Sequence, residues 1–438
     1  MASDWTLKKI GEFAEVKGGK RLPKGKRLSE KKTTHPYIRV VDFTEGRISL
    51  SNLLYVPEEV FPNIKRYIVE SGDVVISIVG TIGLIATIPS ELHAANLTEN
   101  AAKILIEDTT VDSQYLSYYL KSSIGQHEIQ RNTVGSTQPK LPLYGIKNIE
   151  VSYPRLPEQR AIAHILGSLD DKIELNRRMN QTLEATARAT FKSWFVDFVP
   201  VRAKAEGRPT GLPDDIAALF PDSFEGSEIG EIPKGWRVGV VSDLGNVICG
   251  KTPPTKDPEN YGEDIPFITI PDMHGKVFVT QTGKYLSTKG ANTQRNKYLP
   301  AKTICVSCIA TPGLVVMTTK RSQTNQQINS VIPKSKRSSY YCYQVLNRLG
   351  DQIRAGGSGG SVLLNLNKTL FSNIKVLIPD SETIESYQQI VEPFFERLLQ
   401  NQRESVFLSS LRDTLLPKLI SGELRVPDAE KFVEEAGV

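Results

Sequence analysis

The sequence has few cysteines and no long apolar stretch, and these shortages exclude two classes of protein. Four cysteines among 438 residues cannot staple a chain of this length, which excludes a secreted disulfide-rich fold. No apolar run reaches the length of about 18 residues that a membrane span needs, and no signal peptide is recognisable at the first residues. The apolar fraction of 39% suffices for cores in two or three domains. We expect a cytoplasmic protein without membrane contact.

Catalytic motifs are scarce as well. The five histidines are scattered and form no H-E-x-x-H motif. Residues 245–252 match the P-loop string G-x-x-x-x-G-K-[ST], but prolines at 253, 254 and 258 prevent the helix that must begin there. Cys305 and Cys308 have metal-site spacing but no second pair, so we expect them in a core strand. We therefore expect no catalytic residue, no metal and no bound cofactor. A DNA enzyme with an unrecognised site is the alternative.

The net charge of +5 hides an uneven distribution along the chain. Residues 1–154 and 234–378 carry net charges of +2 and +12, whereas residues 155–233 and 379–438 carry −3 and −6. Residues 15–39 alone hold nine basic side chains and two acidic ones. Such a patch is typical of a surface that binds a polyanion, and a solvated loop is the alternative.

The alternation of charge coincides with an internal repeat. Residues 5–20 align with 236–251 at a constant offset of 231, through a shared Trp and a shared Gly-Lys pair. Residues 73–83 align with 303–313 at an offset of 230, and residues 149–154 align with 374–379 at 225. The chain therefore contains two halves, each a block followed by a different segment.

Both blocks are expected to be strand-rich, with brief helices. Short runs of β-branched and aromatic residues, interrupted by Gly, Pro and Asn, predict strands. These runs lie at 37–43, 73–79, 103–106, 266–270, 303–309 and 330–333. Residues 112–121 predict a helix.

The segment after each block predicts a long helix, because apolar or small residues recur in the four-three alternation of a coiled-coil seam. In the first segment, opened by Pro157, they are Ile162, Leu166, Leu169, Ile173, Asn176, Asn180, Leu183, Ala187, Thr190 and Trp194. In the second, opened by Asp380 or Ser381, they are Tyr387, Val391, Phe394, Leu398, Asn401, Ser405, Leu408, Arg412 and Leu415. At about 1.5 Å per residue, each helix spans on the order of 54 Å.

The order block, helix, block, helix predicts that the two helices run antiparallel and pair along their seams. Asn176 and Asn180 would then meet Asn401 and Ser405 in the seam. A buried Asn penalises slipped pairings, so we expect these four residues to fix the register of the helix pair. The alternative is that they face solvent.

The whole pattern resembles the specificity (S) subunit of type I restriction-modification systems. The segments that carry the resemblance are Leu156–Ala185 at the first helix, 220–224 and 230–236 before the second block, and 415–424 at the second helix. The resemblance implies an α+β fold. It also implies two strand-rich α/β target recognition domains, separated by two antiparallel coiled-coil helices, with a pseudo-two-fold repeat. The expected boundaries are 1–154 and 233–379 for the domains, 155–199 and 380–425 for the spacer helices, 200–232 for a linker and 426–438 for a C-terminal tail.

The resemblance also implies a non-catalytic reader of double-stranded DNA. Each recognition domain would read one half of a bipartite target, and the helices would set the gap and dock two modification (methyltransferase) subunits. Those partners would supply S-adenosylmethionine, and restriction or translocase subunits would bring ATP and Mg²⁺. The specificity subunit of a type IIB system and a coiled-coil scaffold without sequence-specific DNA binding are the alternatives.

Candidate DNA-binding residues are cations in Gly- and Pro-rich loops and amide or hydroxyl side chains that can read base edges. In the first block they are Lys17, Lys20, Arg21, Lys24, Lys26, Arg27, Thr81, Ser136, Gln138 and Lys140. In the second block they are Lys251, Lys256, Thr311, Arg321, Asn325, Gln326 and Ser358. Ordinary solvated surface is the alternative for each of them.

Overall fold

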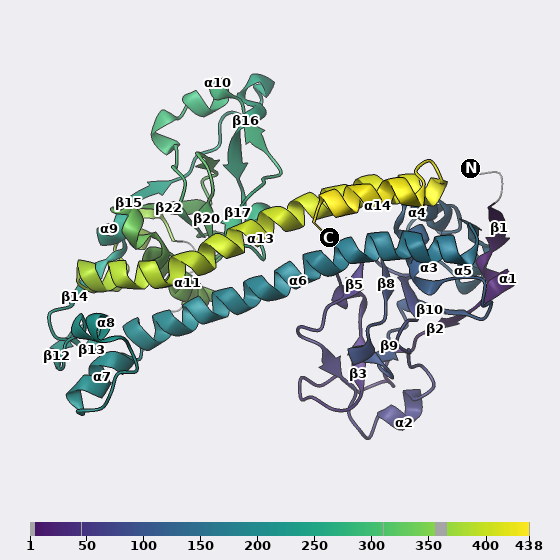
Figure 1. Cartoon of the computed structure of the whole chain (residues 1–438), viewed down its shortest axis with the longest axis horizontal. Coiled ribbons are helices and arrows are strands. Elements are labelled where there is room, and N and C mark those ends of the chain that lie inside the picture. Colours follow the sequence, from purple (N-terminus) through teal and green to yellow (C-terminus); the bar gives the residue numbers. More distant parts are fainter. Residues whose placement is uncertain (1–4, 45, 310, 355–365, 438) are drawn as a thin grey trace. The chain divides into compact units, whose positions relative to one another are not determined.

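The computed structural model describes residues 5–44, 46–309, 311–354 and 366–437 (Figure 1). The chain forms two compact units. The first unit consists of Met1–Glu174 and Ser405–Val438, and the second of Leu175–Glu404. Each strand-rich block therefore lies within one unit, whereas each long helix begins in one unit and ends in the other.

The first unit is built on a four-stranded antiparallel sheet. Its strand order is β2 (Ala14–Gly18), β10 (Ala101–Ile106), β7 (Val74–Ser77) and β8 (Ile85–Thr87). Ile76 and Ile104 pack on one face with the helices, whereas Val75 and Ala101 join a separate cluster on the other face. This alternation follows from the two-residue period of a strand. The sheet is thus buried on both faces.

Smaller elements complete the first unit. The strand β3 (Pro36–Ile38) lies between β6 (Leu54–Tyr55) and β9 (Asn96–Leu97), while β1 (Thr6–Lys9) pairs with β11 (Glu150–Tyr153) and β4 (Phe43–Thr44) with β5 (Arg47–Ile48). The short helices are α1 (Ile10–Phe13), α2 (Phe61–Ile64), α3 (Ser113–Lys121), α4 (Ser123–Arg131) and α5 (Leu143–Asn148). The unit also holds α14 (Val426–Glu435). The predicted helix at 112–121 is confirmed as α3, which Asp112 caps by accepting a hydrogen bond from the Tyr115 amide.

The second unit repeats this plan with a five-stranded sheet. Its order is β15 (Gly245–Cys249), β22 (Ile328–Pro333), β19 (Ile304–Ser307), β20 (Val315–Thr318) and β17 (Phe278–Val279). A three-stranded sheet has the order β18 (Tyr285–Leu286), β16 (Tyr261–Ile268), β21 (Gln323–Thr324), and β14 (Arg237–Val240) pairs with β23 (Lys375–Ile378). The short helices of this block are α9 (Val241–Leu244), α10 (Thr288–Asn292), α11 (Ser339–Arg354) and α12 (Lys368–Ser372).

The repeat inferred from the sequence is confirmed by the matching elements. The series β1, α1, β2 in the first unit corresponds to β14, α9, β15 in the second at the offset of 231. In each small sheet the middle strand has one antiparallel and one parallel neighbour. All six predicted strand segments contain strands, although the first one is limited to β3 and β4.

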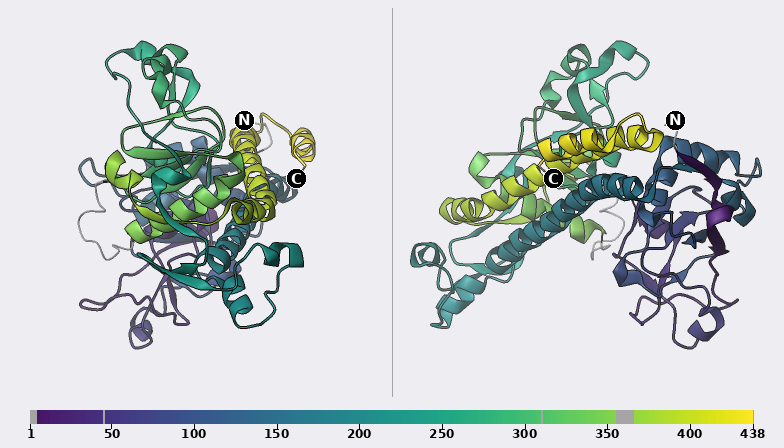
Figure 2. Two further views of the ribbon diagram at one scale, coloured as in Figure 1. Left: turned by 90° about the vertical axis from the view of Figure 1, so that its left-hand side faces the viewer. Right: turned by 45° about the vertical axis from the view of Figure 1, so that its right-hand side comes forward.

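The two long helices are α6 (Leu156–Phe195) and α13 (Ser381–Ser421), which lie side by side in Figures 1 and 2. In the first unit Arg412 of α13 contacts Asp170 of α6 at 2.7 Å. In the second unit the Tyr387 hydroxyl donates to the Ala187 carbonyl at 3.1 Å. Residue numbers rise on one helix as they fall on the other, so the predicted antiparallel pairing is confirmed within each unit. None of the predicted seam side chains is exposed.

The seam of the second unit contains paired amides. Asn401 is buried and donates to Oδ1 of Asn180 at 2.9 Å. Asn176 is also buried and donates to Oε2 of Glu404 at 2.9 Å. Ser405, which follows Glu404 in α13, is half-buried and belongs to the first unit. The role of these residues in fixing the register stays a prediction.

Residues 200–232, expected to be a linker, are folded as part of the second unit. They form α7 (Val199–Ala205), α8 (Asp214–Ala218) and the hairpin β12 (Phe224–Ser227) with β13 (Gly230–Pro233). Val201 and Phe220 are buried in the same core as Trp194 and Trp236. Burial of these apolar side chains outweighs the Pro- and Gly-rich composition that predicts a linker. None of the described helices is long and apolar enough to cross a membrane.

Candidate nucleic-acid interface

The candidate interface of the first unit begins where β2 ends at the shared Gly-Lys pair. The Gly19 amide donates to the Ala101 carbonyl at 3.0 Å, and the Lys20 amide donates to the Leu97 carbonyl at 2.8 Å. The chain leaving β2 therefore lies directly against the turn that joins β9 to β10. We call this close approach of two backbone segments the Gly-Lys crossing. The Lys20 side chain is exposed there, with its ammonium 5.8 Å from the centre of the Tyr67 ring.

The second unit has the same crossing after β15. The Gly250 amide donates to the Ile328 carbonyl at 3.0 Å, and the Lys251 amide donates to the Thr324 carbonyl at 2.9 Å. Lys251 is exposed, like Lys20. No helix begins at Lys251, so the structure excludes the phosphate-binding helix of a P-loop at this position.

Glycine is required at both crossings because two backbones approach closely. A Cβ atom on Gly19 would lie 2.1 Å from the Thr98 carbonyl oxygen, and one on Gly250 would lie 2.1 Å from that of Asn325. A side chain at either place would push the crossing apart. The Gly-Lys pair shared by the two halves thus has a structural cause, and it places a lysine at the same point in each unit.

We call residues 98–100 of the first unit and 325–327 of the second the central turns. In the first unit the Asn100 carbonyl accepts from the Ile78 amide at 2.8 Å, and Thr98 Oγ1 accepts from the Asn100 amide at 3.5 Å. Each central turn therefore lies between a Gly-Lys crossing and a loop of the main sheet, the loop after β7 in the first unit and the loop after β19 in the second.

The second central turn is held by matching bonds. The Gln327 carbonyl accepts from the Cys308 amide at 2.9 Å, and Asn325 Oδ1 accepts from the Gln327 amide at 3.1 Å. Gln326, at the tip, is exposed. The structure thus gathers the predicted residues Lys251, Asn325 and Gln326 at one place.

The loops after β7 and β19 are anchored by equivalent serines. Ser77 donates to the Thr81 carbonyl at 2.6 Å and accepts from the Leu84 amide at 2.8 Å. Ser307 donates to the Thr311 carbonyl at 2.6 Å and accepts from the Leu314 amide at 2.8 Å. Each serine thus fastens the described residues on either side of its loop, and the predicted side chains of Thr81 and Thr311 are exposed.

A third candidate loop joins this site in the first unit. Lys140 bridges to Val79 and Val134, so the loop with Ser136 and Gln138 lies beside the loop with Thr81. All three predicted side chains of this loop, at 136, 138 and 140, are exposed. Its counterpart in the second half, with Ser358, lies outside the described residues.

The remaining basic candidates are exposed but more widely spread. Lys17 pairs with Glu15 at 2.7 Å, and Lys26 lies 4.0 Å from Glu59. Arg21, Lys24, Arg27 and Lys256 are exposed without an ion pair to any described residue. Arg321 lies over the Tyr298 ring, with its guanidinium carbon 3.6 Å from the ring centre. Lys17, Lys20 and Arg21 of the first basic segment lie at or next to the Gly-Lys crossing.

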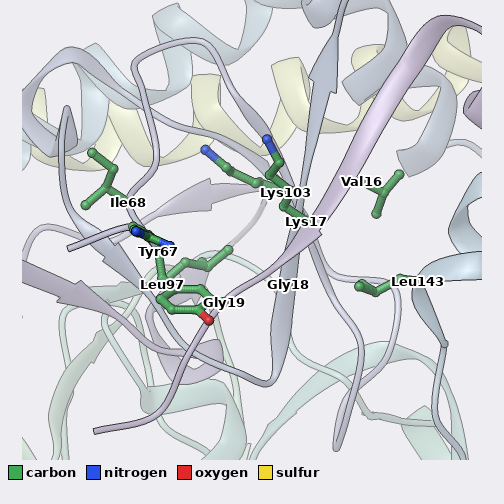
Figure 3. A pocket seen from close by; sticks show the side chains of 10 residues that line it. Val16, Lys17, Gly18, Gly19, Tyr67, Ile68, Leu97, Lys103 and Leu143 are labelled. Carbon is green, nitrogen blue, oxygen red and sulfur yellow. The ribbon is translucent and has the colours of Figure 1, made fainter. Parts of the chain in front are cut away.

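Our sequence analysis missed a small cavity beside the first crossing (Figure 3). The cavity measures about 280 Å³, and Lys17, Arg66, Tyr67 and Lys103 line it together with apolar residues and the two glycines. Lys17 and Lys103 are partners on neighbouring strands, and Figure 3 shows their side chains pointing the same way. Lys103 is paired with Asp73 at 3.6 Å, whereas Arg66 is exposed and has no carboxylate of a described residue within ion-pair distance.

The repeat could have identified part of this site. Tyr67 and Tyr298 are separated by the offset of 231, a cation precedes each of them, and a cation lies over each ring. Aromatic rings with adjacent cations are common on surfaces that bind nucleic acid. The correspondence between the two central turns was harder to find, because the offset there is 227 and the letters differ.

The thiols of Cys305 and Cys308 are buried, and burial raises their pKa to about 12 and about 11. Cys305 lies in β19 and accepts a hydrogen bond from Ser330. Such thiols stay protonated near neutral pH, which suits a core position rather than a metal ligand. Within the described ranges no group of three His, Cys, Asp or Glu side chains could hold a metal ion.

Burial also raises the pKa of Tyr37 to about 12, so its hydroxyl remains a donor. It donates to the Lys20 carbonyl at 2.9 Å and to Oε2 of Glu99 at 3.4 Å. Tyr37 therefore ties the small sheet to both the Gly-Lys crossing and the central turn of the first unit.

Comparisons with known proteins identify the family. The model of the type I restriction modification DNA specificity domain matches residues 2–185 and 233–406. The HindI specificity subunit of Haemophilus influenzae, a type I restriction enzyme subunit, is 42% identical over 331 residues, which are 66% of this chain and 72% of that protein. The MjaIX specificity subunit of Methanocaldococcus jannaschii is 26% identical over 446 residues, 97% of this chain and 94% of that protein.

A solved structure supports the fold. The crystal structure of a type I restriction-modification S subunit from M. genitalium matches with a TM-score of 0.56 at 16% identity, and the match covers 95% of this chain and 96% of that one. The two family-domain matches coincide with the two halves of the repeat, and each includes one block and part of one long helix. The chain therefore belongs to the type I restriction-modification DNA specificity subunit family.

Proposed function

We propose that this chain selects a bipartite double-stranded DNA target for a type I restriction-modification complex. Each strand-rich block reads one half of the target through its central turn and the loops beside it. The observation that carries this proposal is the occurrence of the same exposed arrangement in both units. A Gly-Lys crossing, a central turn with polar side chains and a Ser-anchored loop lie together in each.

The charges at these sites suit a phosphate backbone. In the first unit Lys20 and Arg66 are exposed, and no described carboxylate lies within ion-pair distance of either. In the second unit the same holds for Lys251 and Arg321. Phosphate contacts of this kind position a protein on DNA, whereas the amide and carboxylate side chains of the central turns supply groups that can discriminate bases.

The long helices have a different role in this proposal. They set the unread gap between the half-sites and dock two modification subunits. The chain itself holds no catalytic group, cofactor or metal in the proposed complex. The modification subunits supply S-adenosylmethionine, and restriction or translocase subunits supply ATP and Mg²⁺.

A mobility-shift titration of the full chain with long duplex DNA tests the proposal. A reader that contacts about 6 to 10 phosphates should lose roughly 10³- to 10⁵-fold in affinity between 50 and 200 mM salt. A specific duplex, found by mapping methylation in cells with and without the gene, should bind tighter than a scrambled one. A coiled-coil scaffold would show neither the salt dependence nor the sequence preference.

A further inference from the structure

The two central turns present different chemical groups from equivalent positions. Glu99 is at the tip of the first turn and Gln326 at the tip of the second, and both side chains are exposed. The residue after each tip shows that the two positions are equivalent. The Asn100 carbonyl accepts from the Ile78 amide, and the Gln327 carbonyl accepts from the Cys308 amide.

Each tip side chain is held at one of its two terminal atoms. Oε2 of Glu99 accepts from Thr98 Oγ1 at 3.2 Å and from the Tyr37 hydroxyl at 3.4 Å. None of the described residues donates to its Oε1. The first tip therefore offers an oriented hydrogen-bond acceptor to solvent, next to the Lys20 and Tyr67 side chains of the crossing.

The second tip offers the opposite polarity. Oε1 of Gln326 accepts from Thr252 Oγ1 at 2.6 Å, which directs the amide nitrogen away from the threonine. That nitrogen has no acceptor in the part of the chain that the structure describes. A hydrogen-bond donor is thus oriented towards solvent beside Lys251.

We propose that Glu99 and Gln326 are the base-discriminating residues of the two half-sites and that they read opposite polarities. This inference rests on the proposed function. Glu99 requires a base with an amino donor in the major groove, which is cytosine or adenine. Gln326 requires a base with an acceptor there, which excludes cytosine. The hydrogen bonds from Thr98, Tyr37 and Thr252 orient the two side chains before DNA binds, so little side-chain entropy is lost on contact.

Two isosteric exchanges test the assignment. Glu99→Gln keeps an acceptor for Thr98 and Tyr37 but replaces the solvent-facing acceptor by a donor, so it should change one position of the first half-site to a base with an acceptor, which excludes cytosine. Gln326→Glu keeps the bond from Thr252 but replaces the donor by an acceptor. It should change one position of the second half-site to cytosine or adenine. A well-placed contact to a base edge corresponds to a preference of about 5- to 150-fold, and changes of this size are expected.

The measurement is selection of bound sequences from randomised duplexes by the full-length wild-type and variant chains. Glu107→Gln is a matched control for the first unit, because Glu107 is exposed at the opposite end of β10. Gln352→Glu, on the exposed surface of α11, is the control for the second. Both controls should select the wild-type sequence.

The outcomes separate this inference from the function on which it rests. Changes confined to one half-site for each variant support the assignment. Variants that select the wild-type sequence, or that lose affinity equally for all sequences, overturn the assignment and leave the proposed function standing. A wild-type chain that enriches no sequence overturns both.

Discussion

At the scale of single residues, glycine is preserved in the repeat where backbones touch, whereas the exposed tip of the central turn varies. Gly19 and Gly250 are kept because a carbonyl oxygen lies 2.1 Å from the place of a Cβ atom. Glu99 and Gln326 differ although their backbones are held by the same bonds. This division is what a reader with two different half-sites requires, since the scaffold must be constant while the presented groups change.

Gly19→Ala should therefore disturb the first unit. The added methyl group would collide with the Thr98 carbonyl and displace the central turn, which we expect to cost about 1–3 kcal/mol in the free energy of unfolding. Urea denaturation followed by circular dichroism measures this loss. Gly18→Ala is the control, because its Cβ would lie 3.8 Å from Leu143, an ordinary contact. Equal unfolding midpoints for the two variants would contradict the argument.

The sequence predicted the repeated Gly-Lys pairs and Gln326 in the second block, but not Glu99, the counterpart of Gln326 in the first block. The pair Gly19 and Lys20 repeats as identical letters at a constant offset, whereas Glu99 and Gln326 share neither letter nor that offset. Their correspondence depends on hydrogen bonds between segments far apart in the chain, such as Ile78 to Asn100. Local patterns carry no information on such contacts.

At the scale of elements, prediction succeeded where periodicity is long and local. The helices α6 and α13 follow a seam that continues over many turns, so both their existence and their antiparallel pairing could be inferred. Two-residue strands such as β4 and β9 have no periodic signal, because their neighbours in the sheet determine them. The folding of residues 200–232 was missed for a similar reason, since burial of Val201 and Phe220 depends on a core assembled elsewhere.

Asn401→Leu tests the polar pair in the helix seam. It removes the donor to Asn180 Oδ1 and leaves that half-buried oxygen without this hydrogen bond. The free energy of unfolding should fall by about 1–3 kcal/mol. The double variant Asn180→Leu with Asn401→Leu replaces both partners by apolar groups and should recover this stability. Thermal unfolding of the wild type, the single variants Asn401→Leu and Asn180→Leu and the double variant measures the coupling. Strictly additive losses would show that the two amides do not act as a pair.

At the scale of the whole molecule, the distribution of charge follows the internal repeat. The blocks carry the net charges of +2 and +12, and the segments between and after them are acidic. The proposed function assigns the blocks to DNA and the helices to spacing and protein partners. The two assignments make separate predictions, because a change in helix length should leave the residues at the central turns untouched.

Duplicating one heptad in each long helix, residues 176–182 in α6 and 398–404 in α13, should lengthen the gap in the DNA target. A heptad adds about 10 Å of helix and preserves the seam, which corresponds to about three base pairs at 3.4 Å each. Mapping the methylated target of the assembled enzyme should therefore reveal unchanged half-sites with a longer spacer. A heptad duplicated in α6 alone is the control, because it breaks the pairing and should abolish methylation. If the enzyme with both heptads duplicated still methylates targets with the original spacing, the helices do not determine the gap and the spacing must be set within the two blocks.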